Sequence, residues 1–205
     1  MGAGDEAPLA GIDVSHFQGE VDWRAVAAAG VRFAFVKATE GLDDVDPCFA
    51  RNWQQSRAAG LLRGAYHFLH PNLDAKQQAA HFLAVVTLDD DALPPALDVE
   101  VTNGVHPATL TACIETWLGA VEAAVGCKPV VYTDPSFWRD NVGADLASYP
   151  LWLACYAPSP EVPASWQSWT FWQHSQSGSV EGIAGPVDLD SCQLSLEQLR
   201  GLRTG

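Results

Sequence analysis

The sequence predicts an α/β protein, an irregular TIM-like barrel of five βα units followed by three strands with little helix between them. Short apolar runs alternate with amphipathic segments in the earlier part of the chain, which predicts parallel strands covered by helices. Eight such runs are found, the number of strands in a closed barrel. The helical segments stop before the last runs. The alternative is an open doubly wound sheet, but no glycine-rich phosphate-binding turn follows the first strand.

Each expected strand is a short apolar run bounded by turn residues. In chain order the strands are expected at residues 11–15, 33–37, 62–68, 93–100, 130–133, 151–154, 171–174 and 187–190. Prolines begin the fourth run, where a strand tolerates them. We expect residues 38–46 to form a loop, and Ser177-Gly178 to form a turn before the last strand.

Helix-start and helix-stop residues delimit the segments between these strands. Helices are expected at 23–29 after Asp22, from Pro47 to Gly60, at 74–87, at 107–125 before Gly126, in a short piece after Pro135, and after Ser195, which forms a capping box with Gln198. There are no repeats or linkers. We therefore expect one catalytic barrel domain over residues 10–205, preceded by a tail at 1–9.

Composition limits the possible partners. The chain has 205 residues, 48% of them hydrophobic, so it can bury a core of its own. Its formal charge of −14 argues against nucleic acid and anionic membranes as partners. No apolar run approaches the roughly 20 residues of a membrane span, so we expect no membrane insertion. We expect a monomer with no cofactor.

The cysteines and the first residues indicate the chemical setting. The chain has five cysteines, an odd number, and no C-x-x-C spacing. We expect mostly buried free thiols, not a disulfide or zinc framework. Residues 1–6 lack the basic and apolar regions of a signal peptide. Release by lysis, export by a specialised secretion system, and a leader missing from this chain are all compatible with this.

Two acids end the fourth expected strand. Asp98 and Glu100 are two residues apart, so on a strand they share one face with Cα atoms roughly 6.5–7 Å apart. Like charges at that distance raise the pKa of one carboxyl, which suits a general acid at a glycosidic bond. An isolated D-x-E is a weak motif, and a pair of solvated loop acids is the alternative.

The other strand ends strengthen the catalytic interpretation. In barrels of this kind, functional residues lie at the carboxyl ends of the strands. The residues expected there are Asp13, Lys37, Tyr66, His67, Asp98, Glu100, Tyr132, Trp152, Tyr156, Gln173, His174, Asp188 and Asp190. Aromatic faces stack on sugar rings, and carboxylates accept hydrogen bonds from hydroxyls. The sequence therefore predicts a carbohydrate cleft with an acidic centre.

Several of these residues have a second interpretation. Lys37 either holds a substrate carboxylate or pairs with a neighbouring acid. Asp190 either shares a face with Asp188 or is a solvated end residue. Trp152 is expected in the cleft because it lies on a strand near the mouth.

Other residues have a structural interpretation. His67 and His70, with His16 as a third candidate, could bind a metal. A strand end and a loop do not define a shared ligand geometry, however, so we expect no metal site. Tryptophans in expected helices are more typical of the core than of a cleft. These are Trp23, Trp53 and Trp117.

At its strand motifs the chain resembles a known family. The motifs are G-I-D-V-S-H with Q-G at 11–19, F-V-K-A-T-E-G at 35–41, G-A-Y-H-F at 64–68, L-D-V-E at 97–100, V-Y-T at 131–133, L-W-L-A at 151–154, W-Q-H-S at 172–175 and V-D-L-D at 187–190. In this order they resemble the Chalaropsis-type lysozymes, the N-acetylmuramidases of glycoside hydrolase family 25. The resemblance covers nearly all of residues 10–193.

The resemblance implies a flattened barrel that hydrolyses the β-1,4 bond between N-acetylmuramic acid and N-acetylglucosamine in peptidoglycan. It implies an acid quartet of Asp13, Asp98, Glu100 and Asp188, with Glu100 as proton donor. One departure concerns Asp190, where the family pattern often has asparagine. The extra acid adds a negative charge near the site.

We expect Glu100 to be the general acid, with Asp98 ionised beside it and orienting the substrate's 2-acetamido group for a substrate-assisted reaction with retention. The expected substrate-binding residues are Tyr66, Tyr132, Trp152, Lys37, Tyr156 and Gln173. The partner is then the peptidoglycan glycan strand. Two alternatives remain: an inert carbohydrate-binding protein on the same fold, and a glycosidase for another N-acetylated glycan such as chitin.

Overall fold

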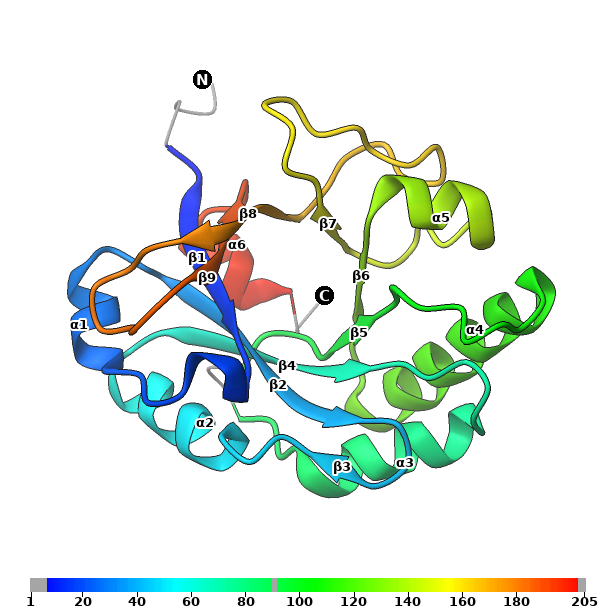
Figure 1. Cartoon of the computed structure of the whole chain (residues 1–205), viewed down its shortest axis with the longest axis horizontal. Helices are drawn as coiled ribbons and strands as arrows, with labels where there is room; N and C mark the ends of the chain where they lie inside the picture. Colours follow the sequence, from blue (N-terminus) through cyan, green and yellow to red (C-terminus); the bar gives the residue numbers. More distant parts are fainter. Residues whose placement is uncertain (1–6, 90–91, 203–205) are drawn as a thin grey trace.

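The chain forms a closed eight-stranded barrel with a short ninth strand at one edge (Figure 1). The computed structural model describes residues 7–89 and 92–202. Neighbouring strands follow the order β1-β9-β8-β7-β6-β5-β4-β2-β3, and pairing of β1 with β2 closes the ring. The strands are β1 (Leu9–Val14), β2 (Phe33–Glu40), β3 (Asp44–Val45), β4 (Leu62–Phe68), β5 (Ala96–Asp98), β6 (Val130–Thr133), β7 (Leu151–Ala154), β8 (Phe171–Gly178) and β9 (Val187–Cys192).

Five βα units come first, as predicted. The helices are α1 (Trp23–Ala28), α2 (Phe49–Ala58), α3 (Ala75–Val85), α4 (Pro107–Val125), α5 (Pro135–Asn141) and, after the last strand, α6 (Leu196–Gly201). No helix lies between β7 and β9, a segment that the structure describes throughout. Helices α1 to α4 run around the lower side of the barrel in Figure 1, and long loops lie over β7.

Local side-chain bonds define where these helices begin. The side chains of Asp22, Asp74 and Asp134 accept hydrogen bonds from backbone N–H groups in the first turns of α1, α3 and α5. Ser195 and Gln198 form the predicted capping box of α6. The predicted starts of α2 and α3 are close to the observed ones, because these signals are local in sequence.

Strand direction departs from the expected parallel sheet in two places. Strand β9 is antiparallel to both β1 and β8, and β3 is antiparallel to β2. Strand β3 lies inside residues 38–46, which were expected to be a loop. Ser177 and Gly178 were expected to form a turn but belong to β8, and the turn follows them. Strand β5 is shorter than expected and ends at Asp98, so Glu100 lies beyond it.

Two apolar layers stabilise the barrel. Inside it, Phe33, Phe35 and Phe171 pack against one another and are fully buried. The Phe35 ring lies over Gly64 so closely that a Cβ there would come within 2.3 Å of it, so only glycine fits. The second layer lies between the sheet and the helices. The interior aromatic layer forms the floor beneath the barrel mouth.

Helix α4 contributes most of one side of the outer layer. Its face with Leu110, Ile114, Trp117, Leu118 and Val121 is buried. With 19 residues and a mean hydropathy of 1.2, it has the length and composition of a membrane-spanning helix. The expectation that no segment approaches that length was therefore wrong, although the buried face packs on the barrel here.

The expected tail and the cysteines complete the fold. Leu9, placed in the tail, already pairs with Cys192 across β1 and β9. Residues 1–6 lie outside the described part of the chain. No disulfide is found within the described residues; Cys113, Cys127 and Cys192 are buried, and Cys48 and Cys155 are half-buried.

Candidate active site

An acidic cleft of about 280 Å³ opens at one end of the barrel. Asp13 and Asp98 reach it from the carboxyl ends of β1 and β5, and Glu100 follows two residues after β5. Asp188 is near the start of β9. Because β9 runs antiparallel, its amino end lies at the same mouth as the carboxyl ends of the other strands. The four acids of the predicted quartet therefore line one cleft.

Asp13 and Asp188 are directly opposed across the β1–β9 ladder. Directly opposed antiparallel residues have Cα atoms about 4.5–5.5 Å apart and side chains on the same face. Burial, followed by the charges of Asp190 and Asp188, raises the pKa of Asp13 well above its usual range. Burial also raises the pKa of Asp188. Ionisation of both carboxyls at the same time is therefore unfavourable.

Gln173 on β8 holds Asp13 in place. Its Nε2 donates to Asp13 Oδ2 at 2.7 Å, and its Oε1 accepts from Tyr132 at 3.0 Å and from Tyr156 at 2.8 Å. The two hydroxyl donors define which end of the amide is oxygen, so its N–H points at Asp13. Gln173 is buried and lines the cleft, where it was predicted.

Asp98 and Glu100 differ in burial. Asp98 is buried, and its Oδ1 accepts no hydrogen bond from the described residues. Burial and then the charge of Glu100 raise the pKa of Asp98 well above its usual range. Taken as a whole residue, Glu100 is exposed at the mouth of the cleft. Its carboxyl is nevertheless partly buried, and this burial raises its pKa. Burial, not repulsion by Asp98, is the main cause of the raised pKa of Glu100.

Lys37 forms the ion pair that one of its two interpretations predicted. Its Nζ lies 2.6 Å from Glu40 Oε2, so it pairs with a neighbouring acid. It also lines the cleft, where its positive charge lowers the pKa of Glu100 and of Asp98. Glu40 in turn binds His70 Nε2 through Oε1 at 2.8 Å.

The aromatic residues form a buried floor and an exposed rim. Tyr66, Tyr132 and Trp152 line the cleft, but they are at most 9% exposed. Trp152 is 2% exposed and stacks on Phe35 with ring centroids 4.2 Å apart. It is therefore part of the core that supports the cleft floor. Tyr156 is 49% exposed and lies at the rim.

Phe17 is a cleft residue that the sequence did not reveal. It is 81% exposed and lies in a short 3-10 helix, His16–Gln18, directly after β1. Ser15 and Gln18 form a capping box around this helix. Their S-x-x-Q spacing is visible in the sequence and could have indicated a rigid segment here.

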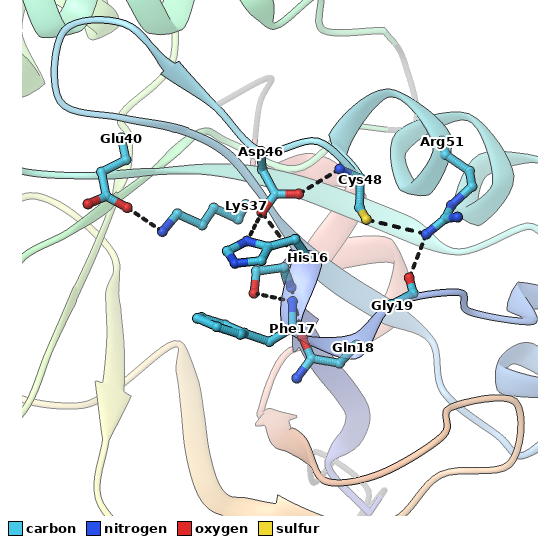
Figure 2. A network of polar contacts seen from close by, with 10 residues as sticks. His16, Phe17, Gln18, Gly19, Lys37, Glu40, Asp46, Cys48 and Arg51 are labelled. Atoms are coloured by element: carbon cyan, nitrogen blue, oxygen red, sulfur yellow. Dashed lines mark hydrogen bonds and ion pairs between the residues drawn. The ribbon is translucent and has the colours of Figure 1, made fainter.

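Asp46 joins this segment to the connection between β3 and α2. Its Oδ2 accepts hydrogen bonds from the backbone N–H of His16 at 2.9 Å and contacts His16 Nδ1 at 2.8 Å, and its Oδ1 accepts from the N–H of Cys48 at 2.9 Å. Figure 2 shows Asp46 between these partners and the Phe17 ring projecting from the same segment. The ring of His16 packs beside it, with centroids 4.2 Å apart.

The histidines serve structural roles. His67 is fully buried, bonded to Thr39 at 2.7 Å and to Gln78 at 3.2 Å, and burial lowers its pKa to about 4. His174 is half-buried and is not a cleft-lining residue. Within residues 7–89 and 92–202, no group of three or more potential metal ligands comes together.

The tryptophans of the helices belong to the core, as predicted. Trp23 and Trp117 are buried. Trp53 is half-buried and packs under the Arg63 guanidinium, 4.2 Å from its ring centroid. None of the three lines the cleft.

Asp190 fits only one of its two interpretations. It is 1% exposed, so it is not a solvated end residue. Its Oδ1 accepts a 2.8 Å hydrogen bond from Trp152 Nε1. It lies below the cleft, in register with Gly11 on β1 and Gln173 on β8.

A barrel with paired carboxyls in an open cleft is typical of glycoside hydrolases. The chain belongs to the glycosyl hydrolases family 25, which it matches over residues 12–183. It is therefore a glycoside hydrolase of the lysozyme and muramidase family, as the strand motifs predicted.

Individual relatives agree with this family. The uncharacterized protein YegX of Escherichia coli K12 is 42% identical over 201 residues, covering 95% of this chain and 73% of that protein. The N,O-diacetylmuramidase of Chalaropsis sp is 33% identical over 200 residues, covering 87% and 95%. The crystal structure of the bacterial lysozyme from Streptomyces coelicolor has a TM-score of 0.92 at 34% identity, covering 97% of this chain and 98% of that chain.

Proposed function

We propose that the protein is an N-acetylmuramidase that hydrolyses the β-1,4 bond from N-acetylmuramic acid to N-acetylglucosamine in bacterial peptidoglycan. The observation that carries this proposal is the gathering of Asp13, Asp98, Glu100 and Asp188 in one cleft of a family 25 barrel. The bacterial cell wall is then the site of action, and a monomer is sufficient because all four acids come from one chain.

Glu100 is the general acid in this proposal. A proton donor to the leaving oxygen must be protonated near neutral pH and must reach the substrate. The pKa of Glu100 is raised, chiefly by burial of its carboxyl, and the residue is exposed at the mouth of the cleft. Asp98 has a raised pKa but is buried, so it is less accessible to a leaving group.

Asp98 orients the substrate's 2-acetamido group. The amide oxygen attacks its own anomeric carbon, the bond to the leaving oxygen breaks, and the proton from Glu100 moves to that oxygen. Water then opens the oxazolinium ion with Glu100 as base, which gives net retention. Asp98 lies below Glu100 and is the ionised member of the pair while Glu100 carries the proton, so its negative charge stabilises the positive charge that develops on the acetamido group.

The remaining cleft residues position the glycan. Asp13 and Asp188 stabilise the positive charge of the transition state from the opposite wall. Lys37, Tyr66, Tyr132, Trp152 and Gln173 shape the floor, and Tyr156 and Phe17 offer exposed rings at the rim on which sugar faces can stack. A glycan strand that crosses the cleft would contact both rim rings.

The chemical identity of the new reducing end tests the proposal. Purified peptidoglycan is digested, the soluble products are reduced with borohydride, and the terminal sugar is identified by mass spectrometry. A muramidase leaves reduced N-acetylmuramic acid. Reduced N-acetylglucosamine at the new ends would instead identify a glucosaminidase, and the proposal would be wrong.

Two alternatives are decided by the same preparation. Release of oligomers from chitin, with no clearing of peptidoglycan, would indicate a glycosidase for another N-acetylated glycan. Binding of peptidoglycan without any new reducing ends would indicate an inert carbohydrate-binding protein. The Glu100→Gln variant is the control, because it should bind but release nothing.

A further inference from the structure

Asp190 is a buried carboxyl that the mechanism above does not use. It lies two residues further along β9 than Asp188, inside the barrel and below the cleft floor. Its Oδ1 accepts the hydrogen bond from Trp152 Nε1. Its Oδ2 is buried, and no N–H or O–H donor of the described residues reaches it. A buried ionised carboxylate with an unpaired oxygen is strongly destabilising.

The neighbour of Asp190 is Asp13. Asp190 lies diagonally from Asp13 on the β1–β9 ladder, within hydrogen-bonding range of it. The charge of Asp190 raises the pKa of Asp13, whereas the hydrogen bond with Asp13 lowers the pKa of Asp190. Two carboxylates cannot form a hydrogen bond, because neither carries a donor. A contact of this kind therefore requires one proton between them, as in a carboxyl–carboxylate pair.

We propose that Asp190 is a positioning residue that carries this proton at neutral pH and donates it as a hydrogen bond from Oδ2 to Asp13. Asp13 then remains the negatively charged member of the pair at the cleft, held by Asp190 from below and by Gln173 Nε2 from the side. The inference rests on the proposed function in so far as Asp13 serves the hydrolysis.

The position of the two residues favours Asp190 as the protonated one. It is the more deeply buried, at 1% exposure against 6% for Asp13, so its ionised form has less access to water. Asp13 lines the cleft, where positive charge of the substrate can compensate its negative charge. Burial raises the pKa of Asp190 to about 8, against the hydrogen bonds with Trp152 and Asp13, which lower it.

The pair has a consequence for pH dependence. The titratable groups that face Asp190 are Asp13 on β1, Asp188 and Cys192 on β9, the backbone-bonded His174 on β8, and Tyr156 after β7. None of these supplies a positive charge when alkali removes the shared proton. Asp13 and Asp190 then repel, and the hydrogen bond that holds Asp13 is lost.

The Asp190→Asn variant tests the proposal through activity. An asparagine amide has the shape of a protonated aspartate: its oxygen accepts from Trp152, and its NH₂ donates to Asp13. We expect the variant to keep activity within about threefold of wild type near pH 6. In the wild type, loss of the shared proton lowers activity at alkaline pH. In the variant, this alkaline decrease in activity should therefore move to higher pH by about one pH unit or more. Asp190→Ala, with no donor, should be impaired at every pH.

A stability measurement tests it without catalysis. A carboxyl whose pKa in the folded protein lies above its unfolded value of about 3.9 releases a proton on unfolding. At a pH below this unfolded value the carboxyl is protonated in both states and does not change the free energy of unfolding. Between the two pKa values, the free energy of unfolding falls as the pH rises. In this window the unfolding constant of the wild type should rise relative to Asp190→Asn by up to about tenfold per pH unit. The exposed Asp43→Asn is the matched control and should follow the wild type.

The outcomes separate the two proposals. An Asp190→Asn protein with the alkaline limb and the pH-dependent unfolding of the wild type would overturn the inference. So would a folded Asp190→Asn protein that is inactive at neutral pH. If neither the wild type nor any variant cleaves peptidoglycan, the proposed function is wrong. The pH dependence of unfolding still decides the inference about Asp190.

A spectroscopic measurement covers the case in which Asp190→Asn does not fold. Carboxyl ¹³C shifts of wild-type protein labelled at aspartate report the protonation of each side chain directly. The expected result is a buried aspartate pair that holds one proton at pH 7. A spectrum in which every aspartate is ionised at that pH would overturn the inference.

Discussion

Gln173 Nε2 donates a hydrogen bond of 2.7 Å to Asp13 Oδ2, which joins β8 to β1 across the intervening strand β9. Rotation of the Gln173 amide would break two hydrogen bonds, because Tyr132 and Tyr156 both donate to its oxygen. The hydrogen bond lowers the pKa of Asp13, against the burial that raises it. One neutral side chain thus connects an acid of the cleft with the tyrosines of its floor and rim.

Gln173→Glu removes this donor and adds a negative charge beside Asp13. Loss of a hydrogen bond to a buried charged group costs about 1–3 kcal/mol, so we expect kcat/KM to fall about 5- to 150-fold. The pKa of Asp13 should rise, and the acid limb of the pH–rate profile should move upward with it. Gln77→Glu on α3, an exposed position, is the control. Equal activity of the two variants would contradict the role given to Gln173.

Glu100→Gln tests the general acid. The amide keeps the shape of the side chain but has no acidic proton to give to the leaving oxygen, and general acid catalysis contributes about 10²–10⁴-fold. We expect a loss of at least this size, with unchanged thermal unfolding. Glu115→Gln on the exposed face of α4 should keep wild-type activity. A Glu100→Gln enzyme with most of the wild-type rate would falsify the assignment.

Trp152→Ala should lower the stability of the fold. Trp152 was expected in the cleft, which it lines, but its ring is buried and stacked on Phe35. Removing a buried aromatic ring lowers the free energy of unfolding by about 3–5 kcal/mol. Urea unfolding followed by circular dichroism measures this. A change below about 0.5 kcal/mol, the range of surface substitutions, would restore the earlier interpretation.

Phe17→Ala should behave in the opposite way. The ring is 81% exposed, so the free energy of unfolding should change by less than about 0.5 kcal/mol. If the ring stacks on a sugar, KM for peptidoglycan fragments long enough to reach the rim should rise about 5- to 10-fold, with kcat unchanged. Phe17→Trp should restore the wild-type KM. An unchanged KM for Phe17→Ala would remove Phe17 from the glycan path.

The configuration of the first product tests the substrate-assisted route. Neighbouring-group attack followed by attack of water inverts the anomeric carbon twice, so the product should first appear as the β-anomer. Proton NMR of a digest, recorded before mutarotation, distinguishes the anomers. An α-anomer would mean a single displacement by water and would end the role given to the acetamido group and to Asp98.

The order of the strands and helices was predictable because its signals are local. Caps such as Asp22 and Ser195, the glycine after α4 and the apolar runs of the strands depend on residues a few positions apart. Asp13 and Asp98 were predictable for a related reason, because the carboxyl ends of parallel strands converge at one mouth of a barrel. Asp188 lies near the amino end of its strand and reaches the same mouth because β9 runs antiparallel.

The sequence by itself determined the eight strands, the five βα units and the family, since each depends on a local pattern or on motif order. Only the tertiary structure decided the direction of β9, the burial of Trp152, the exposed ring of Phe17 and the contact of Asp190 with Asp13. These depend on how residues distant in the chain pack together. Burial and pairing, in turn, set the charge of a carboxyl, and no sequence spacing measures them.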